Sequence, residues 1–228
     1  QQARTIHEYL LRSKHVMNDV MMSATFMMLK RCSISKPTRS YFNILNPVDM
    51  RAWSDRRLPA ANRVGFAFIR RRPVDWSGPE DLLESVANQL RYVRKRGVAA
   101  ELMKGIEMIE NVPLALNRVE RSGRFTPTAT LTCLSNLQLG RRHGVTLEGD
   151  RWRLAGAKVD RVACIAPLPT AVPLAITVTD ANGNIAITIR GARCHFDESR
   201  LKAFGESFCQ SCDEICQYQS RTRKAHGY

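Results

Sequence analysis

Cysteine and histidine are the side chains in this sequence best suited to hold a metal, and one segment concentrates them. Cys209, Cys212 and Cys216 follow one another at intervals of three and four residues, and Cys194-His195 lies upstream. A CxxC pair near a histidine is a pattern found in zinc sites. The segment also has the pattern of a helix interior, where this spacing places small side chains on one side. No second CxxC or histidine pair completes four ligands, so we predict no metal site.

Basic residues are the second chemical feature. Lys+Arg number 35 against 21 Asp+Glu, which gives a formal net charge of +14 and a sequence pI near 10.0. The charge gathers in three clusters, at 70 to 72, 91 to 96 and 221 to 224. Such a balance favours an anionic partner, such as an acidic protein, a phosphorylated ligand or an anionic membrane surface. Nucleic acid is disfavoured, because aromatic residues are only 7% and no nucleic-acid-binding motif is present.

The composition fits one large globular domain or two small ones. Hydrophobic residues make up 44% of the 228, enough to build a core, and no apolar run reaches the ~20 residues that a membrane span needs. The seven cysteines are an odd number and no secretion signal is visible, which favours reduced thiols in the cytoplasm. Peripheral attachment to a membrane is the alternative location.

The elements that must position these side chains alternate between helical and strand periodicity. Asn182-Gly183 between two alternating runs predicts a β-hairpin, and Ser77 and Asp197 are placed to cap helices. We expect helices at about 17–31, 77–96, 98–110, 114–119 and from 197, and strands at about 41–45, 63–70, 126–134, 159–165, 174–179 and 184–190. Residues 217–228 should form a flexible basic tail.

Four short motifs recur in the order found in a known group of enzymes. They are Met17-Asn18-Asp19-Val20 opening a helix, Asn46-Pro47-Val48-Asp49-Met50-Arg51 ending a strand, Ala61-Asn62-Arg63-Val64-Gly65-Phe66 beginning the next, and Leu134-Ser135-Asn136-Leu137 ending a later one. Together they resemble the C-terminal half of the condensation-domain-like acyltransferases, which include nonribosomal peptide condensation domains, polyketide-associated acyltransferases and wax ester synthase/diacylglycerol acyltransferases.

The resemblance implies an α+β fold over residues 1–216. It would be a mixed open β-sheet flanked by helices, forming one lobe of a two-lobed fold like that of chloramphenicol acetyltransferase. In such enzymes the catalytic base sits in an HHxxxDG motif on the N-terminal lobe. The five histidines of this chain, His7, His15, His143, His195 and His226, include no adjacent pair. We therefore expect the catalytic lobe to be a missing partner, and the chain alone to be inactive.

The resemblance also assigns roles to residues that are present. Arg51 matches an arginine that binds the aspartate of HHxxxDG, which suits a planar, permanently charged guanidinium. An exposed loop arginine is the alternative. Asn18 and Asp19 match a helix-opening pair, for which a simple helix cap is an equally good explanation.

The remaining matches lie at strand ends. Ser135 and Asn136 match a position beside the reacting carbonyl, where a hydroxyl or amide would stabilise an oxyanion. An ordinary turn at the end of a strand is the alternative. Asn62 matches part of a Gly-Asn pattern, with Ala61 in place of the glycine.

The function implied is transfer of an acyl group from a thioester to an alcohol or an amine. The donor would be acyl-coenzyme A or an acyl-phosphopantetheine carrier, bound as a substrate, with no permanent cofactor. The alternative is a noncatalytic basic module that binds an acidic protein, an anionic membrane or nucleic acid. The sequence leaves open whether the parent protein is an active enzyme.

Overall fold

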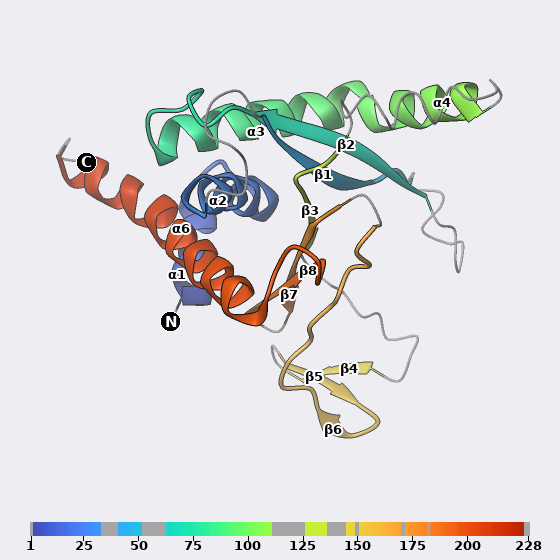
Figure 1. Ribbon diagram of the computed structural model, residues 1–228. Coiled ribbons are helices and arrows are strands. Elements are labelled where there is room, and N and C mark those ends of the chain that lie inside the picture. The colour runs from blue at the N-terminus through green and yellow to red at the C-terminus, as the bar shows by residue number, and fades with distance from the viewer. Residues whose placement is uncertain are drawn as a thin grey trace.

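A five-stranded mixed sheet forms the centre of the molecule (Figure 1). The computed structural model describes residues 2–32, 41–51, 63–110, 126–135, 145–148, 151–169, 172–181 and 183–225. The strand order is β2 (Val64–Arg71), β1 (Phe42–Asp49), β3 (Ala129–Leu134), β7 (Leu174–Ala181) and β8 (Asn184–Gly191). The central strands β1, β3 and β7 are parallel, and both outer strands pair antiparallel with their neighbours. The expected mixed sheet with flanking helices is confirmed.

One face of this sheet is covered by helices. They are α1 (Gln2–Arg12), α2 (Met17–Arg31), α3 (Pro79–Arg96), α4 (Val98–Glu110) and α6 (Glu198–Ala225). Every residue of α2 from Asp19 to Leu29 is buried, because α3, α6 and strand β3 of the sheet pack on this helix. The methionines of α2 therefore belong to the core, which a flexible thioether fills well.

Alternation along the strands separates the two faces of the sheet. Ile44, Ile69 and Ile176 point toward the helices and are fully buried. On the opposite face, Leu45 and Phe68 are only half-buried. The sheet thus has one closed face and one less covered face.

A second, three-stranded sheet lies apart from the helices, at the lower end of the molecule in Figure 1. Its strands are β4 (Val145–Glu148), β5 (Arg151–Leu154) and β6 (Ala157–Lys158), all antiparallel. The buried Trp152 packs with Ala181 at the end of β7. The sequence analysis did not anticipate this sheet.

Two of the predicted helix boundaries agree with the structure. The α2 bounds match the prediction, and Gly97, with φ of 64° in the left-handed region, separates α3 from α4. The predicted start of α3 is corrected, because Gly78 rather than Ser77 is the N-cap. Ser77 instead donates through its backbone N and its hydroxyl to Asp81 Oδ2.

The predicted end of β1 at Asn46-Pro47 is wrong, since the strand continues to Asp49. Pairing with β3 ends at Leu45↔Thr130, so no neighbouring strand on that side needs the amide hydrogen that Pro47 lacks. The strand predicted at 159–165 is also wrong. That segment forms no ladder, and the backbone amides of Cys164 and Ala166 donate to threonine hydroxyls of β7 instead.

The C-terminal predictions are met in part. The β7–β8 hairpin is confirmed, and Asp197 Oδ1 accepts the Arg200 amide 2.7 Å away as a helix cap. The last helix runs to Ala225, so much of the segment predicted as a flexible tail is helical. The helix expected at 114–119 lies outside the described residues.

Gly65 explains why α4 can approach β2. A Cβ at this position would meet the Met50 side chain and would lie 3.1 Å from the Ala99 Cβ of α4. A larger residue would push α4 from the sheet, which gives a packing reason for the glycine of the third motif.

Candidate functional site

The carboxyl ends of the three parallel strands meet at one edge of the sheet. β1, β3 and β7 end at Asp49, Leu134 and Ala181, respectively. In open sheets this edge is where ligands usually bind, because side chains and backbone groups beyond the strand ends are free to meet them. We call it the carboxyl edge.

Strands β1 and β3 separate toward the carboxyl edge. Their register contains only two partners, Ile44↔Ala129 and Leu45↔Thr130, although β1 continues to Asp49 and β3 to Leu134. The Thr130 hydroxyl is buried near this divergence and has no hydrogen-bond partner among the described residues. Beyond the pair Leu45↔Thr130, the register of the two strands contains no further partners among the described residues.

Ser135 lies at this edge, directly after β3, and is exposed. The last pair of the β3–β7 register is Leu134↔Thr179, which brings Ser135 beside Asp180 of β7. Its hydroxyl is therefore accessible at the carboxyl edge. The oxyanion role stays a prediction, and Asn136 and Asn62 lie outside the described residues.

Arg51 follows β1 at the same edge and binds Asp49. Arg51 Nε lies 2.9 Å from Asp49 Oδ1, and Nη2 lies 2.7 Å from Oδ2. This hydrogen bonding raises the pKa of Arg51, and both side chains are more than half exposed, at 54% and 56%. The guanidinium is held in a forked ion pair and remains accessible at the surface.

A histidine–aspartate pair is the contact that the sequence analysis missed. His7 Nε2 of α1 lies 3.1 Å from Asp180 Oδ1 of β7, across 173 residues of sequence. No local signal predicts such a contact. Asp180 and burial together raise the pKa of the nearby Cys133 thiol to about 12, with burial as the main cause. Cys133 is therefore a protonated thiol at neutral pH rather than a nucleophile.

Asn18 and Asp19 lie away from the carboxyl edge, at the buried start of α2. The N-cap is Val16. Asp19, at the N3 position, accepts the Val16 backbone amide through Oδ2 at 3.0 Å, which is the contact that the N3 side chain makes in a capping box. Asn18 is not the cap, and its buried Oδ1 has no hydrogen-bond partner in the described part of the chain. The helix-start interpretation of Asp19 is supported by this geometry.

His15 and Asp19 reproduce part of the catalytic spacing, since His15 precedes Asp19 by four residues. The residue before it is Lys14, so the histidine pair is still lacking. The His15 side chain is buried beneath α1 and α3, and it therefore has no access to a substrate.

The cysteines of α6 are packed into the helical layer. Cys212 and Cys216 are buried, and burial raises the pKa of Cys216 to about 12. Cys212 Sγ lies 4.0 Å from Met21 Sδ of α2. In the described part of the chain, no group of three His, Cys, Asp or Glu side chains is arranged to hold a metal ion.

Within the described ranges, no helix combines the length and the apolar character needed to cross a membrane.

Comparison with known proteins reveals similarity in structure alone. No family model and no curated protein matches the sequence. The condensation domain of the Monacolin K polyketide synthase MokA has a TM-score of 0.62 and 14% identity over 95% of this chain and 45% of that one. The epimerization domain from the third module of tyrocidine synthetase B has a TM-score of 0.60 and 13% identity over 95% and 46%, respectively.

A third solved structure is polyketide synthase associated protein 5 from Mycobacterium tuberculosis. Its TM-score is 0.53, with 15% identity over 94% of this chain and 49% of that one. The chain thus spans less than half the length of these structures. Nearly all of it has the α+β fold found in condensation domains, which have the two-lobed architecture of chloramphenicol acetyltransferase.

Proposed function

We propose that this chain is the C-terminal lobe of an acyltransferase. The enzyme would move an acyl group from a thioester, on coenzyme A or a carrier-protein arm, to an alcohol or an amine. The observation that carries the proposal is the match of 95% of the chain to a condensation domain at a TM-score of 0.62. The ordered motifs of the sequence support the same assignment.

The carboxyl edge is where this lobe would meet the rest of the enzyme. Ser135 would donate a hydrogen bond to the developing oxyanion, and Asn136, the next residue in the sequence, is the second candidate donor. Arg51 would bind the aspartate of an HHxxxD motif on a partner lobe. Its present partner, Asp49, is exposed, so exchanging one carboxylate for another requires no rearrangement of the core.

The lobe alone would be inactive, because the general base is supplied by that missing histidine motif. The test is transfer of a radiolabelled octanoyl group from octanoyl-coenzyme A, or from an octanoyl-phosphopantetheine carrier protein, to hexadecanol or an amine. We expect transfer with the protein encoded by the complete gene and none with residues 1–228. A complete gene without HHxxxD, whose product transfers nothing, would overturn the proposal.

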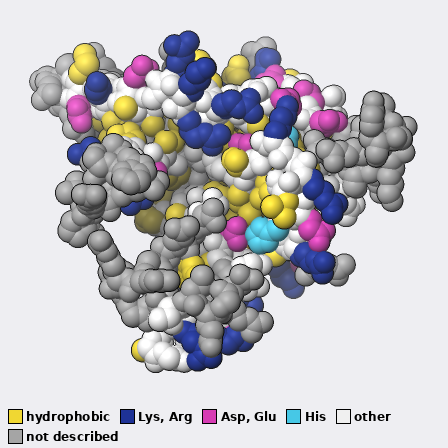
Figure 2. Space-filling view, turned by 180° about the vertical axis from the view of Figure 1, so that it is seen from behind, with side chains coloured by type: hydrophobic (Ala, Val, Ile, Leu, Met, Phe, Trp, Pro, Cys, Tyr) yellow, Lys and Arg dark blue, Asp and Glu magenta, His cyan; other side chains and the backbone are white. Residues whose placement is uncertain are grey.

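A noncatalytic binding module is the second candidate, and the surface of α3 favours it. Figure 2 shows Lys and Arg side chains gathered along the upper part of one face of the molecule. On α3, Arg94, Lys95 and Arg96 are exposed and form no ion pair among the residues that the structure describes. Salt-dependent binding to anionic vesicles or an acidic protein, without acyl transfer by the complete protein, would support it.

A further inference from the structure

The junction between α1 and α2 buries polar atoms that lack hydrogen-bond partners. Among the described residues these include His15 Nδ1 and Asp19 Oδ1. The His15 side chain is only 2% exposed, and its ring stacks on that of Tyr9 with 6.4 Å between centroids and 3° between planes. A buried imidazole without a partner for one nitrogen is costly to protonate, because water cannot solvate the added charge.

One ring of this stack, that of Tyr9, belongs to the last turn of α1. Ile6 and Tyr9 are its buried side chains, and both belong to the main core. At the other end of α1, Gln2 Nε2 donates to the Cys209 carbonyl of α6 at 2.7 Å. His7 contacts Asp180 in the middle. Loss of the His15 stack would thus free one end of α1 while the other contacts remain.

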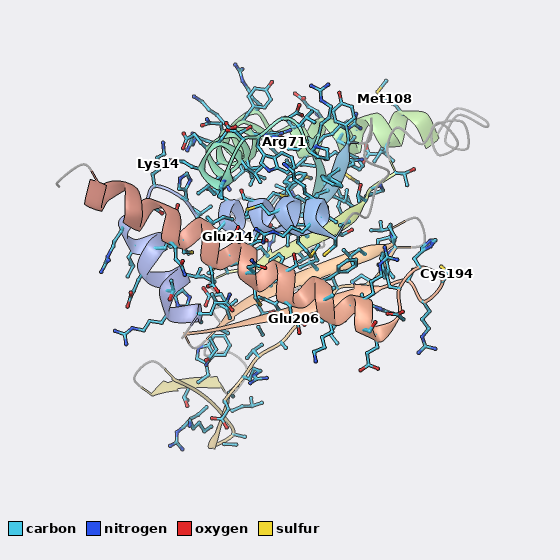
Figure 3. All side chains as sticks on the ribbon, turned by 60° about the vertical axis from the view of Figure 1, so that its left-hand side comes forward. Lys14, Arg71, Met108, Cys194, Glu206 and Glu214 are labelled. Carbon is cyan, nitrogen blue, oxygen red and sulfur yellow. The ribbon has the colours of Figure 1, made fainter. Side chains whose placement is uncertain are left out.

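Charged groups approach His15 from the elements around it. On the α3 side, Glu84 Oε2 lies 3.9 Å from His15 Nε2, and Lys14 Nζ binds Glu84 Oε1 at 2.9 Å. Figure 3 shows Lys14 at this junction, close to α3. Asp19 of α2 and Arg91 of α3 also act on the charge of His15. Asp19 and Glu84 favour a protonated His15, whereas Lys14 and Arg91 oppose it.

We propose that His15 is a pH-sensitive latch that keeps the end of α1 docked in the core when neutral and releases it when protonated. The contacts of Gln2 with α6 and of His7 with Asp180 would remain, so release is confined to the last turn of α1. The latch does not depend on the proposed acyl transfer.

The direction of the effect follows from burial. Burial is the largest influence on His15 and lowers its pKa below the ordinary 6.5, despite Asp19 and Glu84. The docked state then binds fewer protons than the released state. Docking of α1 is complete above pH 6.5 and weakens as the pH falls below it.

The test is amide hydrogen exchange of α1 in the full chain at pH 7.5 and 5.5, expressed as protection factors. In the wild type we expect protection of residues 8–12 to fall by up to about tenfold, the limit for one group with an ordinary pKa of 6.5 at a pH one unit lower. His15→Phe keeps an aromatic ring for the Tyr9 stack but does not titrate, so its protection should be independent of pH. His195→Gln removes an exposed histidine and should preserve the wild-type fall. An equal fall in His15→Phe would overturn the latch.

A second measurement covers the case in which His15→Phe does not fold. The ring proton resonances of the wild-type protein report each histidine separately during a pH titration. The pKa of His15 should lie below the ordinary 6.5. A pKa of His15 at or above that value would refute the proposal. Neither experiment measures acyl transfer, so the latch and the proposed function can fail independently.

Discussion

The start of α2 and the carboxyl edge of the sheet carry residues of the same motif set in opposite environments. Asp19 is 3% exposed and holds the first turn of its helix through the Val16 amide. Ser135 and Arg51 are exposed, and within the described residues the Arg51 side chain binds its near neighbour Asp49. Burying a polar group is costly unless the fold uses it. This difference in exposure distinguishes motif residues that stabilise the lobe itself from exposed residues that are accessible to a ligand or another lobe.

The largest expected effect concerns the buried helix α2. Phe26 of α2 is fully buried and packs on Trp76 with 6.2 Å between ring centroids. Phe26→Ala should lower the free energy of unfolding by about 3–5 kcal/mol through lost burial and a cavity. Urea unfolding followed by circular dichroism measures it. Tyr92→Ala, at a side chain that is 59% exposed, should change it by less than about 0.5 kcal/mol. Similar losses in both variants would contradict the burial of α2.

The second prediction concerns the exposed carboxyl edge and rests on the proposed function. Ser135→Ala should lower acyl transfer by the complete protein about 10²-fold, the effect of removing one oxyanion donor. The urea midpoint should not change, because the side chain is exposed. Thr146→Ala removes an exposed hydroxyl from the small sheet and should leave both quantities unchanged. Equal activity of the Ser135 and Thr146 variants would exclude the oxyanion role.

A smaller effect is expected at the start of α2. Asp19→Ala removes the acceptor for the Val16 amide and should cost about 0.5–2 kcal/mol of unfolding free energy. Asp19→Asn keeps an acceptor oxygen and should cost less. Thermal unfolding of the two variants separates the hydrogen bond from the charge. A greater loss in Asp19→Asn than in Asp19→Ala would rule out the capping role.

The smallest effect is expected for Arg51. Its ion pair with Asp49 is exposed and connects residues two apart in sequence, so Arg51→Ala should leave the thermal midpoint unchanged. If Arg51 binds a partner lobe, acyl transfer by the complete protein should nevertheless fall. A drop in the thermal midpoint of residues 1–228 would place Arg51 with Asp19 among the residues that build the lobe.

Sequence reasoning succeeded where the determinants are local. Apolar periodicity gave the bounds of α2, and Asn182-Gly183 located the β7–β8 hairpin. It failed for β1, where continuation through Pro47 depends on the divergence of β3 far along the chain. The short strands β4 to β6 offer too few residues for a periodic signal.

The site was less predictable than the fold for the same reason. Ser135 and Arg51 could be placed at strand ends from their motifs, and both are there. The contact between His7 and Asp180 joins the first helix to β7 across 173 residues, and no local pattern encodes it. Residues that converge only through tertiary packing need the structure to be recognised.

The distribution of thiols also has a practical consequence. Of the seven free cysteines, only Cys194 is exposed, and Figure 3 shows it on the connection between β8 and α6. Gly191 lies just before it, where an added Cβ would come within 2.7 Å of Phe196 and 2.8 Å of Leu201, so this connection is tightly packed. A thiol-reactive fluorophore would attach first at Cys194. The native chain can therefore be labelled at Cys194 without mutation. The fluorescence of the label would report on the connection between β8 and α6.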